Sequence, residues 1–438
     1  MSKRILVIGA GTIGLSAAFQ CARKGHRVTV LERDGPRRNG CSFGNAGMIV
    51  PSHFVPLAAP GMVKLGLKWM WNPESPFYIQ PRLDWELFSW GWKFWRASNA
   101  EHVRRSAPLL RDLNFASRAL FEEFAGASAA DAAPSVSPAV PGPTGGRRGL
   151  GDFGLVRRGL LMLCQTPHAL EEEARFATQA NQLGVPATVL DAAQVAKLDP
   201  GVTMNVAGAV HFPRDAHFTP DRYIEALQNA CEALGVIFVW GAEAGRLHAH
   251  RNKLAAVQAG GAEFEFDELV LCGGAWSPLL VRELGLKLPM QAGKGYSLTL
   301  AHPRELPQLC SIFTEARLAI TPMGSALRFG GTMELSGLTQ KINPVRVQGI
   351  LKAVPKYFPK FSAADFAGVE PWSGLRPCSP DGLPYLGRTA KYSNLIVAAG
   401  HAMMGMSLSP ITGKIIGEIV DGEKPAFELK PLSPDRYA

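Results

Sequence analysis

The 438-residue chain lacks any apolar run of the roughly 18 residues that a membrane-spanning helix requires. Its first apolar stretch follows Lys3 and Arg4 but runs directly into GAGTIG, which favours a folded strand over a secretory signal. Cysteine is also sparse, because the seven cysteines are isolated, with no CxxC pair and no repeated spacing. This pattern predicts a reducing compartment and argues against a disulfide framework or a structural zinc site.

A dense block of one charge is absent as well. The net charge is +9, with 46 Lys and Arg against 37 Asp and Glu, but the basic residues are spread along the whole chain. This spread favours an anionic substrate, cofactor or membrane surface over a nucleic acid. No two His, Cys or acidic residues recur at the spacing of metal ligands, and no Ser-His-Asp or Cys-His nucleophile set can be argued. Neither a metal site nor a covalent nucleophile is therefore predicted.

What the sequence does contain is a glycine-rich fingerprint near its start. Residues 4–8 (RILVI) are a short apolar run typical of a buried strand, and residues 12–24 carry apolar side chains at helical spacing. A second strand-like run follows at residues 27–31. A GxGxxG pattern joins the first run to the helix. This strand–turn–helix–strand order is the context in which GxGxxG predicts a dinucleotide site on a Rossmann-like α/β fold.

Each position of the fingerprint has a physical task. Gly9 permits the tight turn, Gly11 lets backbone N–H groups approach a pyrophosphate, and Gly14 lets the helix pack closely on the strand. The N-terminus of the helix adds partial positive charge near the phosphates. Glu32 ends the second strand and would accept hydrogen bonds from ribose hydroxyls. Its charge would also repel the 2′-phosphate of NADP.

Two stretches have an unusual composition. Residues 62–96 hold six of the nine tryptophans, interleaved with Lys and Arg. Two interpretations of this stretch are open: a buried pair of aromatic helices, or a surface that rests on a membrane or a redox partner. Residues 126–150 are rich in Ala, Pro, Ser and Gly, with few side chains that could build a core. They predict a mobile surface insertion rather than a linker.

The rest of the chain alternates between strand-like and helical runs, without internal repeats. A helix is predicted at 220–234, strands at 236–240 and 269–272, several strands over 295–332, and a last helix at about 407–420.

Several blocks together resemble FAD-dependent D-amino-acid dehydrogenases, which belong to the wider D-amino-acid oxidase and sarcosine oxidase superfamily. The blocks that follow the GxGxxG fingerprint are SFGNAGMIVPS, HFTPDRYIEAL, LVLCGGAWSPLL, KGYSLTL, GLRPCSPDGLPYLG and GHAMMG. The combination of KGYSLTL with GLRPCSPDGLPYLG is the most specific feature, since it is typical of flavoproteins that oxidise amines and amino acids. The resemblance covers the chain except for residues 126–150.

The resemblance implies an α/β fold, in which a Rossmann-like FAD-binding domain is interleaved with an α+β substrate-binding domain whose β-sheet covers the flavin. The FAD-binding domain would comprise residues 1–90, 217–290 and 372–438, and the substrate domain residues 91–216 and 291–371.

The resemblance also implies a set of FAD contacts. The stretch from Ser42 to Met48 should run beside the isoalloxazine ring, the backbone near Ala244 should contact the adenine, and the last helix should point its N-terminus at the flavin pyrimidine edge. The expected cofactor-binding residues are Gly9, Gly11, Ile13, Gly14, Glu32, Arg33, Ser42, Asn45, Ala46, Gly47, Met48, Ala244, Gly273, Gly274, Trp276, Gly400, His401, Met403, Gly405 and Met406.

The sequence departs from the relatives at three positions. Sarcosine oxidase relatives with covalent flavin carry a cysteine where this chain has Gly374, so we expect non-covalent FAD. Those relatives also carry a substrate-holding lysine where this chain has Met404, which leaves Arg376 as the main cation. Ala402 replaces the second glycine of the commoner GHG sequence, which changes the expected backbone path beside the ring.

Two residues are expected to hold the substrate. A planar guanidinium can bind a carboxylate in bidentate fashion and fix its orientation, so we assign this task to Arg376, with a structural pair to Asp381 as the alternative. Tyr296 is the second candidate, with a buried core tyrosine as its alternative. For His401 we expect a structural hydrogen bond rather than a role as a base.

The activity implied is the FAD-dependent oxidative deamination of D-amino acids to 2-oxo acids and ammonia, by hydride transfer from Cα to flavin N5. Electrons would pass to a quinone or another carrier, and the protein would be cytoplasmic or rest peripherally on the inner face of the cell membrane. Two alternatives stay open. One is a specialist for secondary amines such as D-proline, cis-4-hydroxy-D-proline or N-methylglycine, and the other is a non-catalytic flavin-binding subunit of a complex.

Overall fold

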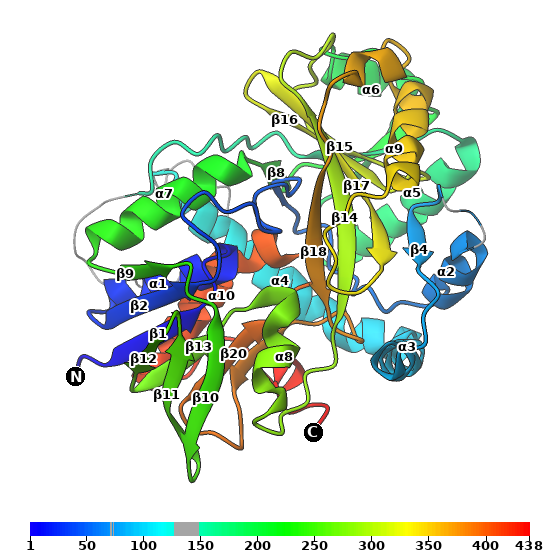
Figure 1. Ribbon diagram of the computed structural model, residues 1–438. Helices are drawn as coiled ribbons and strands as arrows, with labels where there is room; N and C mark the ends of the chain where they lie inside the picture. Colours follow the sequence, from blue (N-terminus) through cyan, green and yellow to red (C-terminus); the bar gives the residue numbers. More distant parts are fainter. Residues whose placement is uncertain (71, 73, 127–148) are drawn as a thin grey trace.

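The computed structural model of the chain describes residues 1–70, 72, 74–126 and 149–438 (Figure 1). Two large β-sheets, each covered by helices, account for most of it. The segment 126–150, predicted to be a mobile insertion, lies almost entirely outside the described residues.

The first sheet has six strands in the order β19-β20-β13-β1-β2-β9. All neighbouring pairs are parallel except β19 with β20. This order places the turn after β1 near the middle of the sheet, where parallel α/β folds bind dinucleotides. The strands are β1 (Arg4–Ile8), β2 (Arg27–Glu32), β9 (Ile237–Trp240), β13 (Glu268–Leu271), β19 (Tyr385–Arg388) and β20 (Leu395–Ala399).

Side chains of β1 alternate between the two faces of this sheet, as the pleat requires. Ile5 and Val7 join a core with four helices, whereas Leu6 and Ile8 pack against a three-stranded meander on the other face. The helices are α1 (Thr12–Arg23), α4 (Ala100–Phe124), α7 (Pro220–Ala233) and α10 (Gly405–Asp421). The meander is β10 (Ala244–His250), β11 (Lys253–Ala259) and β12 (Ala262–Glu265).

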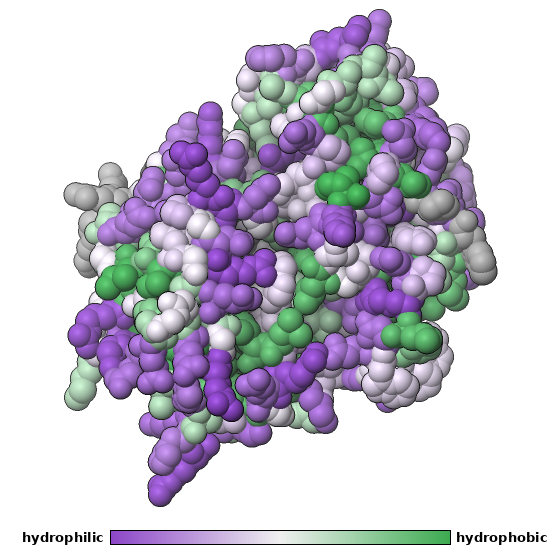
Figure 2. Space-filling model, in the orientation of Figure 1, coloured by the Kyte–Doolittle hydropathy of each residue, from purple (hydrophilic) through white to green (hydrophobic). Residues whose placement is uncertain are grey.

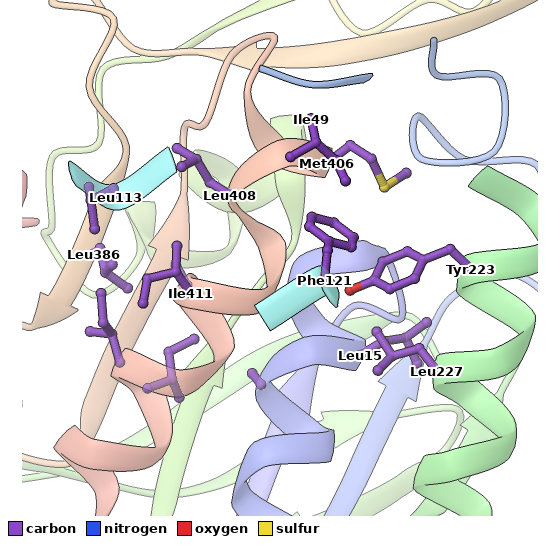
Figure 3. Packing of buried hydrophobic residues seen from close by; sticks show 14 of the residues in the cluster. Leu15, Ile49, Leu113, Phe121, Tyr223, Leu227, Leu386, Met406, Leu408 and Ile411 are labelled. Atoms are coloured by element: carbon purple, nitrogen blue, oxygen red, sulfur yellow. The ribbon is translucent and has the colours of Figure 1, made fainter. Parts of the chain in front are cut away.

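The four helices interlock through small residues and aromatic rings (Figure 3). A Cβ added at Gly413 of α10 would lie 2.4 Å from the carbonyl oxygen of Ser16 in α1, so only glycine permits this approach. Phe121 of α4 and Tyr223 of α7 face each other with ring centroids 5.1 Å apart. The close packing fixes α1 and α10 side by side, with their N-termini at the same edge of the sheet.

The second sheet is mixed and has the order β18-β14-β17-β16-β15-β5-β7-β6, with β4 paired to β17. In Figure 1 it stands upright, and β14 and β18 run down toward the six-stranded sheet. Its strands are β4 (Phe77–Ile79), β5 (Leu160–Cys164), β6 (Thr188–Asp191), β7 (Gly208–Phe212), β14 (Gln291–Leu300), β15 (Cys310–Phe313), β16 (Leu318–Met323), β17 (Ala326–Leu335) and β18 (Trp372–Cys378).

Shorter elements complete the described chain. The helices are α2 (Met62–Met70), α3 (Trp85–Ala97), α5 (Pro167–Gln182), α6 (Ala192–Leu198), α8 (Ser277–Arg282) and α9 (Pro344–Tyr357), and β3 (Met48–Ile49) pairs with β8 (Ala216–His217). Short 3₁₀ turns lie at Gly274–Trp276, Ala363–Phe366 and Lys430–Leu432.

The fold class and the main elements expected from the sequence are confirmed. The expected helix at 220–234 is α7, and the expected strands at 236–240 and 269–272 are β9 and β13. The sheets divide the chain differently from the expected segments in three places. Strands β4 and β18 pair within the mixed sheet, and α4 packs against α10. These contacts join residues far apart in sequence, which local patterns do not report.

The tie between β3 and β8 includes a fully buried carboxyl group. Asp215 accepts hydrogen bonds from the backbone N–H of Ser52 at 3.1 Å and from its Oγ at 2.5 Å. Burial raises the pKa of Asp215 to about 7, although the bonds from Ser52 and the charge of Arg118 act in the opposite direction. The native state therefore holds this proton more tightly than the unfolded chain does.

Changing Asp215 to Asn should remove part of the pH dependence of stability. As pH rises from about 4 to about 7, the unfolded chain ionises this group at no cost while the native state must bury the charge, so the free energy of unfolding falls. Relative to the Asn variant, the natural protein should lose ~1–3 kcal/mol between pH about 5 and about 7. Urea unfolding at both pH values measures this, with exposed Asp152→Asn as the control. An unchanged pH slope in Asp215→Asn would contradict the assignment.

Candidate cofactor and substrate site

A cavity opens at the carboxyl ends of the parallel strands β1, β2 and β13, and it extends to β18 and the start of α10. Ligands bind at this edge in parallel α/β sheets because the loops there meet the N-termini of the helices. The lining residues are contributed by the turn after β1, the end of β2, residues 40–45, residues 242–244, residues 272–280 and residues 375–377.

The turn after β1 has the backbone geometry that the fingerprint predicts. Gly9 has φ +102°, and a Cβ there would lie 2.6 Å from the carbonyl oxygen of Cys272. A Cβ on Gly14 would lie 1.8 Å from the carbonyl oxygen of Gly9. Gly11 has no such neighbour within 3.4 Å and faces the cavity. Two of the glycines therefore serve packing, while the third leaves the backbone open to a ligand.

Two helix N-termini converge on the cavity. Gly11 caps α1 and Met404 caps α10, and neither supplies a side-chain hydrogen bond to the first turn. Neither first turn carries an acidic residue. Ser42 Oγ accepts the N–H of Thr12, but the cap residues bind no other N–H of the two first turns. These N–H groups and the positive end of the helix dipole favour negative charge at both ends of the cavity. This arrangement fits a dinucleotide with a pyrophosphate at α1 and a negatively charged ring edge at α10.

The acid that ends β2 is held firmly at the cavity wall. Glu32 accepts hydrogen bonds from the backbone N–H of Ala10 at 2.7 Å and of Asp34 at 3.1 Å. Beside it, the guanidinium of Arg33 lies over the Trp276 ring, 3.7 Å from the centroid. A wall with a stacked indole ring and a fixed carboxylate suits the nucleoside part of a dinucleotide.

The stretch from Ser42 to Met48 is only partly exposed to the cavity. Ser42 and Asn45 line it, and Ser42 Oγ accepts a hydrogen bond from the backbone N–H of Thr12 at 3.1 Å. Arg328 of the mixed sheet donates to the carbonyl oxygens of Phe43 and Asn45 at 3.0 and 2.8 Å. The mixed sheet thus holds this stretch against the cavity by its backbone.

The loop before α10 brings a buried histidine to the cavity. The ring Nε2 of His401 lies 3.1 Å from Oγ1 of Thr412, and burial lowers the pKa of His401 to about 3. The imidazole therefore stays neutral, which supports a structural role over that of a base. Ala402 adopts φ +48°, in the left-handed region that favours glycine, while its N–H donates to the carbonyl oxygen of Pro377 at 2.9 Å.

Arg376 of β18 is the lining residue that was expected to hold the substrate. Its Nη1 donates to the carbonyl oxygen of Thr332 at 2.9 Å. Within the described ranges, no carboxylate lies within salt-bridge distance of it. The alternative pair with Asp381 is wrong, because both oxygens of Asp381 bind Arg436, at 2.7 and 3.0 Å. Arg376 is therefore available to an anionic ligand.

Tyr296 lies outside the cavity lining, and the structure corrects its predicted role as a substrate ligand. It is buried on the face of β14 opposite to the Arg376 guanidinium, where its hydroxyl donates to Glu334 at 2.7 Å. Lys294 on the same face pairs with Glu334 at 3.3 Å. The other interpretation, a buried core tyrosine, matches this position.

The structure divides the expected site residues into two groups. Those that line the cavity are Gly9, Gly11, Ile13, Glu32, Arg33, Ser42, Asn45, Ala244, Gly273, Gly274, Trp276, Arg376, His401, Gly405 and Met406. Those that do not are Gly14, Ala46, Gly47, Met48, Tyr296, Gly400 and Met403. Gly47 serves packing instead, since a Cβ there would lie 2.2 Å from the carbonyl oxygen of Phe218. Met403 is 47% exposed to solvent.

Sequence reasoning missed Arg38 and Cys41, which also line the cavity. Arg38 donates to the carbonyl oxygen of Ala10 at 3.0 Å, and its guanidinium lies 4.8 Å from the centroid of the Trp240 ring. Burial lowers the pKa of Arg38. The basic run PRR just after β2 was a usable signal, because a cation there lies next to the carboxyl edge of the sheet.

Comparison with known proteins agrees with this geometry. A family described as FAD dependent oxidoreductase (DAO) matches residues 4–419. The D-amino acid dehydrogenase of Rhizorhabdus wittichii is 31% identical over 441 residues, covering 99% of this chain and 100% of that protein. That of Granulibacter bethesdensis is 29% identical over 442 residues, with 99% and 100% covered. The crystal structure of glycine oxidase from Geobacillus kaustophilus is similar in fold, with a TM-score of 0.74, 23% identity and complete coverage of both chains.

Changing Ala402 to Gly should stabilise the protein. A side chain in the left-handed region costs ~1–2 kcal/mol, and the greater freedom of glycine in the unfolded chain offsets part of this. We expect a net gain of ~0.5–1 kcal/mol, measured by thermal or urea unfolding with flavin bound. The control is Ala174→Gly inside α5, which should lose ~1 kcal/mol. A loss at both positions would show that the loop accepts Ala402 without strain.

Proposed function

The chain belongs to the DAO family of FAD-dependent oxidoreductases, and from this premise we propose that it oxidises D-amino acids to imino acids. Water then converts the imino acids to 2-oxo acids and ammonia. Full-length relatives at about 30% identity that are named D-amino acid dehydrogenase support this choice of substrate. The observation that carries the proposal is Arg376, which lines the cavity and has no carboxylate within salt-bridge distance among the described residues.

Arg376 binds the substrate carboxylate. Two parallel N–H···O bonds from a planar guanidinium fix both the distance and the rotation of the carboxylate, which an ammonium group does less well. Fixing the carboxylate limits the positions that the Cα–H bond can take. FAD bound in this cavity would supply the acceptor for the hydride that leaves Cα. The neutral His401 adds no positive charge beside the substrate amine, which must itself be neutral when its C–H bond breaks.

The packing around Gly374 supports FAD that is held without a covalent bond. A Cβ at Gly374 would lie 2.1 Å from the Trp372 ring and 3.0 Å from Cα of Cys41. A side chain long enough to reach the flavin from this position therefore has no room. The N-termini of α1 and α10 and the open backbone at Gly11 and Gly274 provide the non-covalent contacts in its place.

The electrons leave, we propose, to a quinone or another membrane carrier. The tryptophan-rich stretch forms α2 and α3. These two helices are not buried, so the interpretation as a buried pair of aromatic helices is wrong. On α3 only Trp90 is buried, while Trp85, Phe88, Trp92 and Trp95 are between 55 and 83% exposed. Figure 2 shows pale and apolar residues at this end of the molecule among polar ones. With Lys64, Lys68, Lys93 and Arg96 nearby in the sequence, this surface suits the anionic face of a bilayer.

A membrane contact of this kind would be peripheral. In the described parts of the chain, none of the helices combines the length and the apolar character needed to span a bilayer.

Changing Arg376 to Leu should raise KM for D-amino acids and leave FAD bound. Loss of a charge-assisted bidentate contact costs ~2–5 kcal/mol, which corresponds to a rise in KM of about 30-fold or more. Initial rates with a dye acceptor, together with the flavin absorbance of the purified protein, measure both effects. Arg96→Leu on α3 is the matched control.

The substrate panel separates the proposal from its alternatives. D- and L-alanine, D-proline and N-methylglycine are each added without oxygen, and bleaching of the flavin absorbance is followed. Faster bleaching by D-proline than by D-alanine would identify a secondary-amine specialist. A flavin that no amino acid bleaches would identify a non-catalytic subunit.

For the arginine variant, an unchanged KM in Arg376→Leu would show that Arg376 does not bind the substrate.

Replacing Trp92 and Trp95 with Ser should weaken binding to anionic vesicles. The two rings lie 4.9 Å apart on the exposed face of α3, and each would bury apolar area in the lipid interface. Losing ~2–4 kcal/mol of this burial corresponds to a loss of affinity of about 30-fold or more. Co-sedimentation with phosphatidylglycerol vesicles measures it, and Ile237→Ser on the exposed β9 edge is the control. Equal binding of all three proteins would exclude the α3 surface as the contact.

A further inference from the structure

The side chain of Arg376 crosses a neighbouring strand to reach its position. Strands β18, β14 and β17 lie in this order, and Arg376 of β18 is paired with Gly293 of β14. Its hydrogen-bond acceptor, the carbonyl oxygen of Thr332, belongs to β17, one strand farther. The guanidinium therefore lies across the middle strand.

The middle strand accepts the guanidinium because it has a glycine beneath it. A Cβ at Gly295 would lie 2.1 Å from Nη1, 2.4 Å from Cζ and 2.4 Å from Nη2 of Arg376. These distances are far below van der Waals contact, so any side chain at this position would displace the guanidinium. The obstructed atoms are the end of a flexible side chain, which can move away without disturbing the sheet.

A β-bulge supplies the carbonyl group on the far side. Lys294 pairs with Glu334 and Tyr296 pairs with Gly331, so two residues of β17, Thr332 and Met333, lie opposite Gly295 alone. Thr332 has φ +61°, which is rare for a β-branched residue and costs of order 1–3 kcal/mol. Bulges redirect backbone groups beside functional sites. Here the bulge directs the carbonyl of Thr332 toward Arg376.

Buried polar contacts on the opposite face hold the register of this bulge. Glu334 accepts the hydroxyl of Tyr296 at 2.7 Å and pairs with Lys294 at 3.3 Å. The two partners flank Gly295 in sequence, and all three side chains are buried. A shift of β14 against β17 would break both contacts.

We propose that Gly295 and Thr332 are positioning residues that hold the guanidinium of Arg376 ready for the substrate carboxylate. Gly295 leaves the space in which the guanidinium lies. The carbonyl oxygen of Thr332, a residue with strained backbone, accepts a hydrogen bond from Nη1 and fixes that nitrogen. The proposal rests on the role of Arg376 given above. It assigns the glycine of KGYSLTL to substrate binding without any contact to the substrate.

The first experiment compares Gly295→Ala with Arg376→Leu in the FAD-bound protein. Gly295→Ala should raise KM for D-alanine about tenfold or more, while kcat at saturation changes less and the flavin content is unchanged. Gly91→Ala on α3, where a Cβ would meet no atom within 4 Å, is the matched control. If Arg376→Leu raises KM and Gly295→Ala does not, the proposed positioning role of Gly295 is wrong. If neither raises KM, the role of Arg376 fails instead.

The second experiment tests the space between Gly295 and the Thr332 carbonyl after the arginine side chain has been removed. In Arg376→Ala, added guanidinium at millimolar concentration should bind over Gly295 against the Thr332 carbonyl and recover part of the lost kcat/KM. Sodium chloride at equal concentration is the control for ionic strength. In the double variant with Gly295→Ala, the new methyl group occupies the same place, so recovery should be lost. Equal recovery in the single and double variants would overturn the proposal.

The third experiment separates the backbone of Thr332 from its side chain. Thr332→Gly adopts the same positive φ without strain, so KM should stay within about twofold of the natural value and Tm should not fall. Thr332→Val keeps the β-branched strain and serves as the matched variant. A rise in KM in Thr332→Gly equal to that in Gly295→Ala would show that the side chain, and not the directed carbonyl, is what matters.

Discussion

Substrate binding, as proposed, depends on the charge of one arginine, Arg376, at the meeting point of the two sheets. Arg376 lines the cavity and has no carboxylate partner among the described residues, and a partly buried charge is costly unless it is hydrogen-bonded or meets a ligand. One backbone carbonyl satisfies part of its hydrogen-bonding capacity. The remaining N–H groups can donate hydrogen bonds to an anion. A small carboxylate can accept two of them in parallel, which is the most favourable geometry.

Glycine makes this site possible at both ends. At the dinucleotide end, Gly9 and Gly14 allow β1, α1 and the strand end at Cys272 to come within reach of one another. At the substrate end, Gly295 and Gly374 leave space for a guanidinium and for the Trp372 ring. At Gly9 and Gly14 a methyl group would collide with backbone carbonyl groups, whereas at Gly295 and Gly374 it would displace the guanidinium and the indole ring. This is why the site is built from backbone and a few fixed side chains.

The parts of the fold and site that local sequence determines were predictable. The turn at Gly9, the position of Glu32 and the helix at α7 follow from patterns within about 30 residues. The surroundings of Tyr296 were not predictable, because its contact with Glu334 depends on how β14 pairs with β17. The partner of Asp381 is Arg436, 55 residues away and near the end of the chain, and no short-range pattern reports it. The bulge at Thr332 depends on register between strands, which sequence alone leaves undefined.

The most direct test of the central claim is a crystal structure of the FAD-bound protein with a small carboxylate competitor. The account predicts that both carboxylate oxygens bind the guanidinium of Arg376, beside the flavin, while Nη1 keeps its bond to the Thr332 carbonyl. A carboxylate bound elsewhere in the cavity, with the guanidinium turned away from β14, would contradict it.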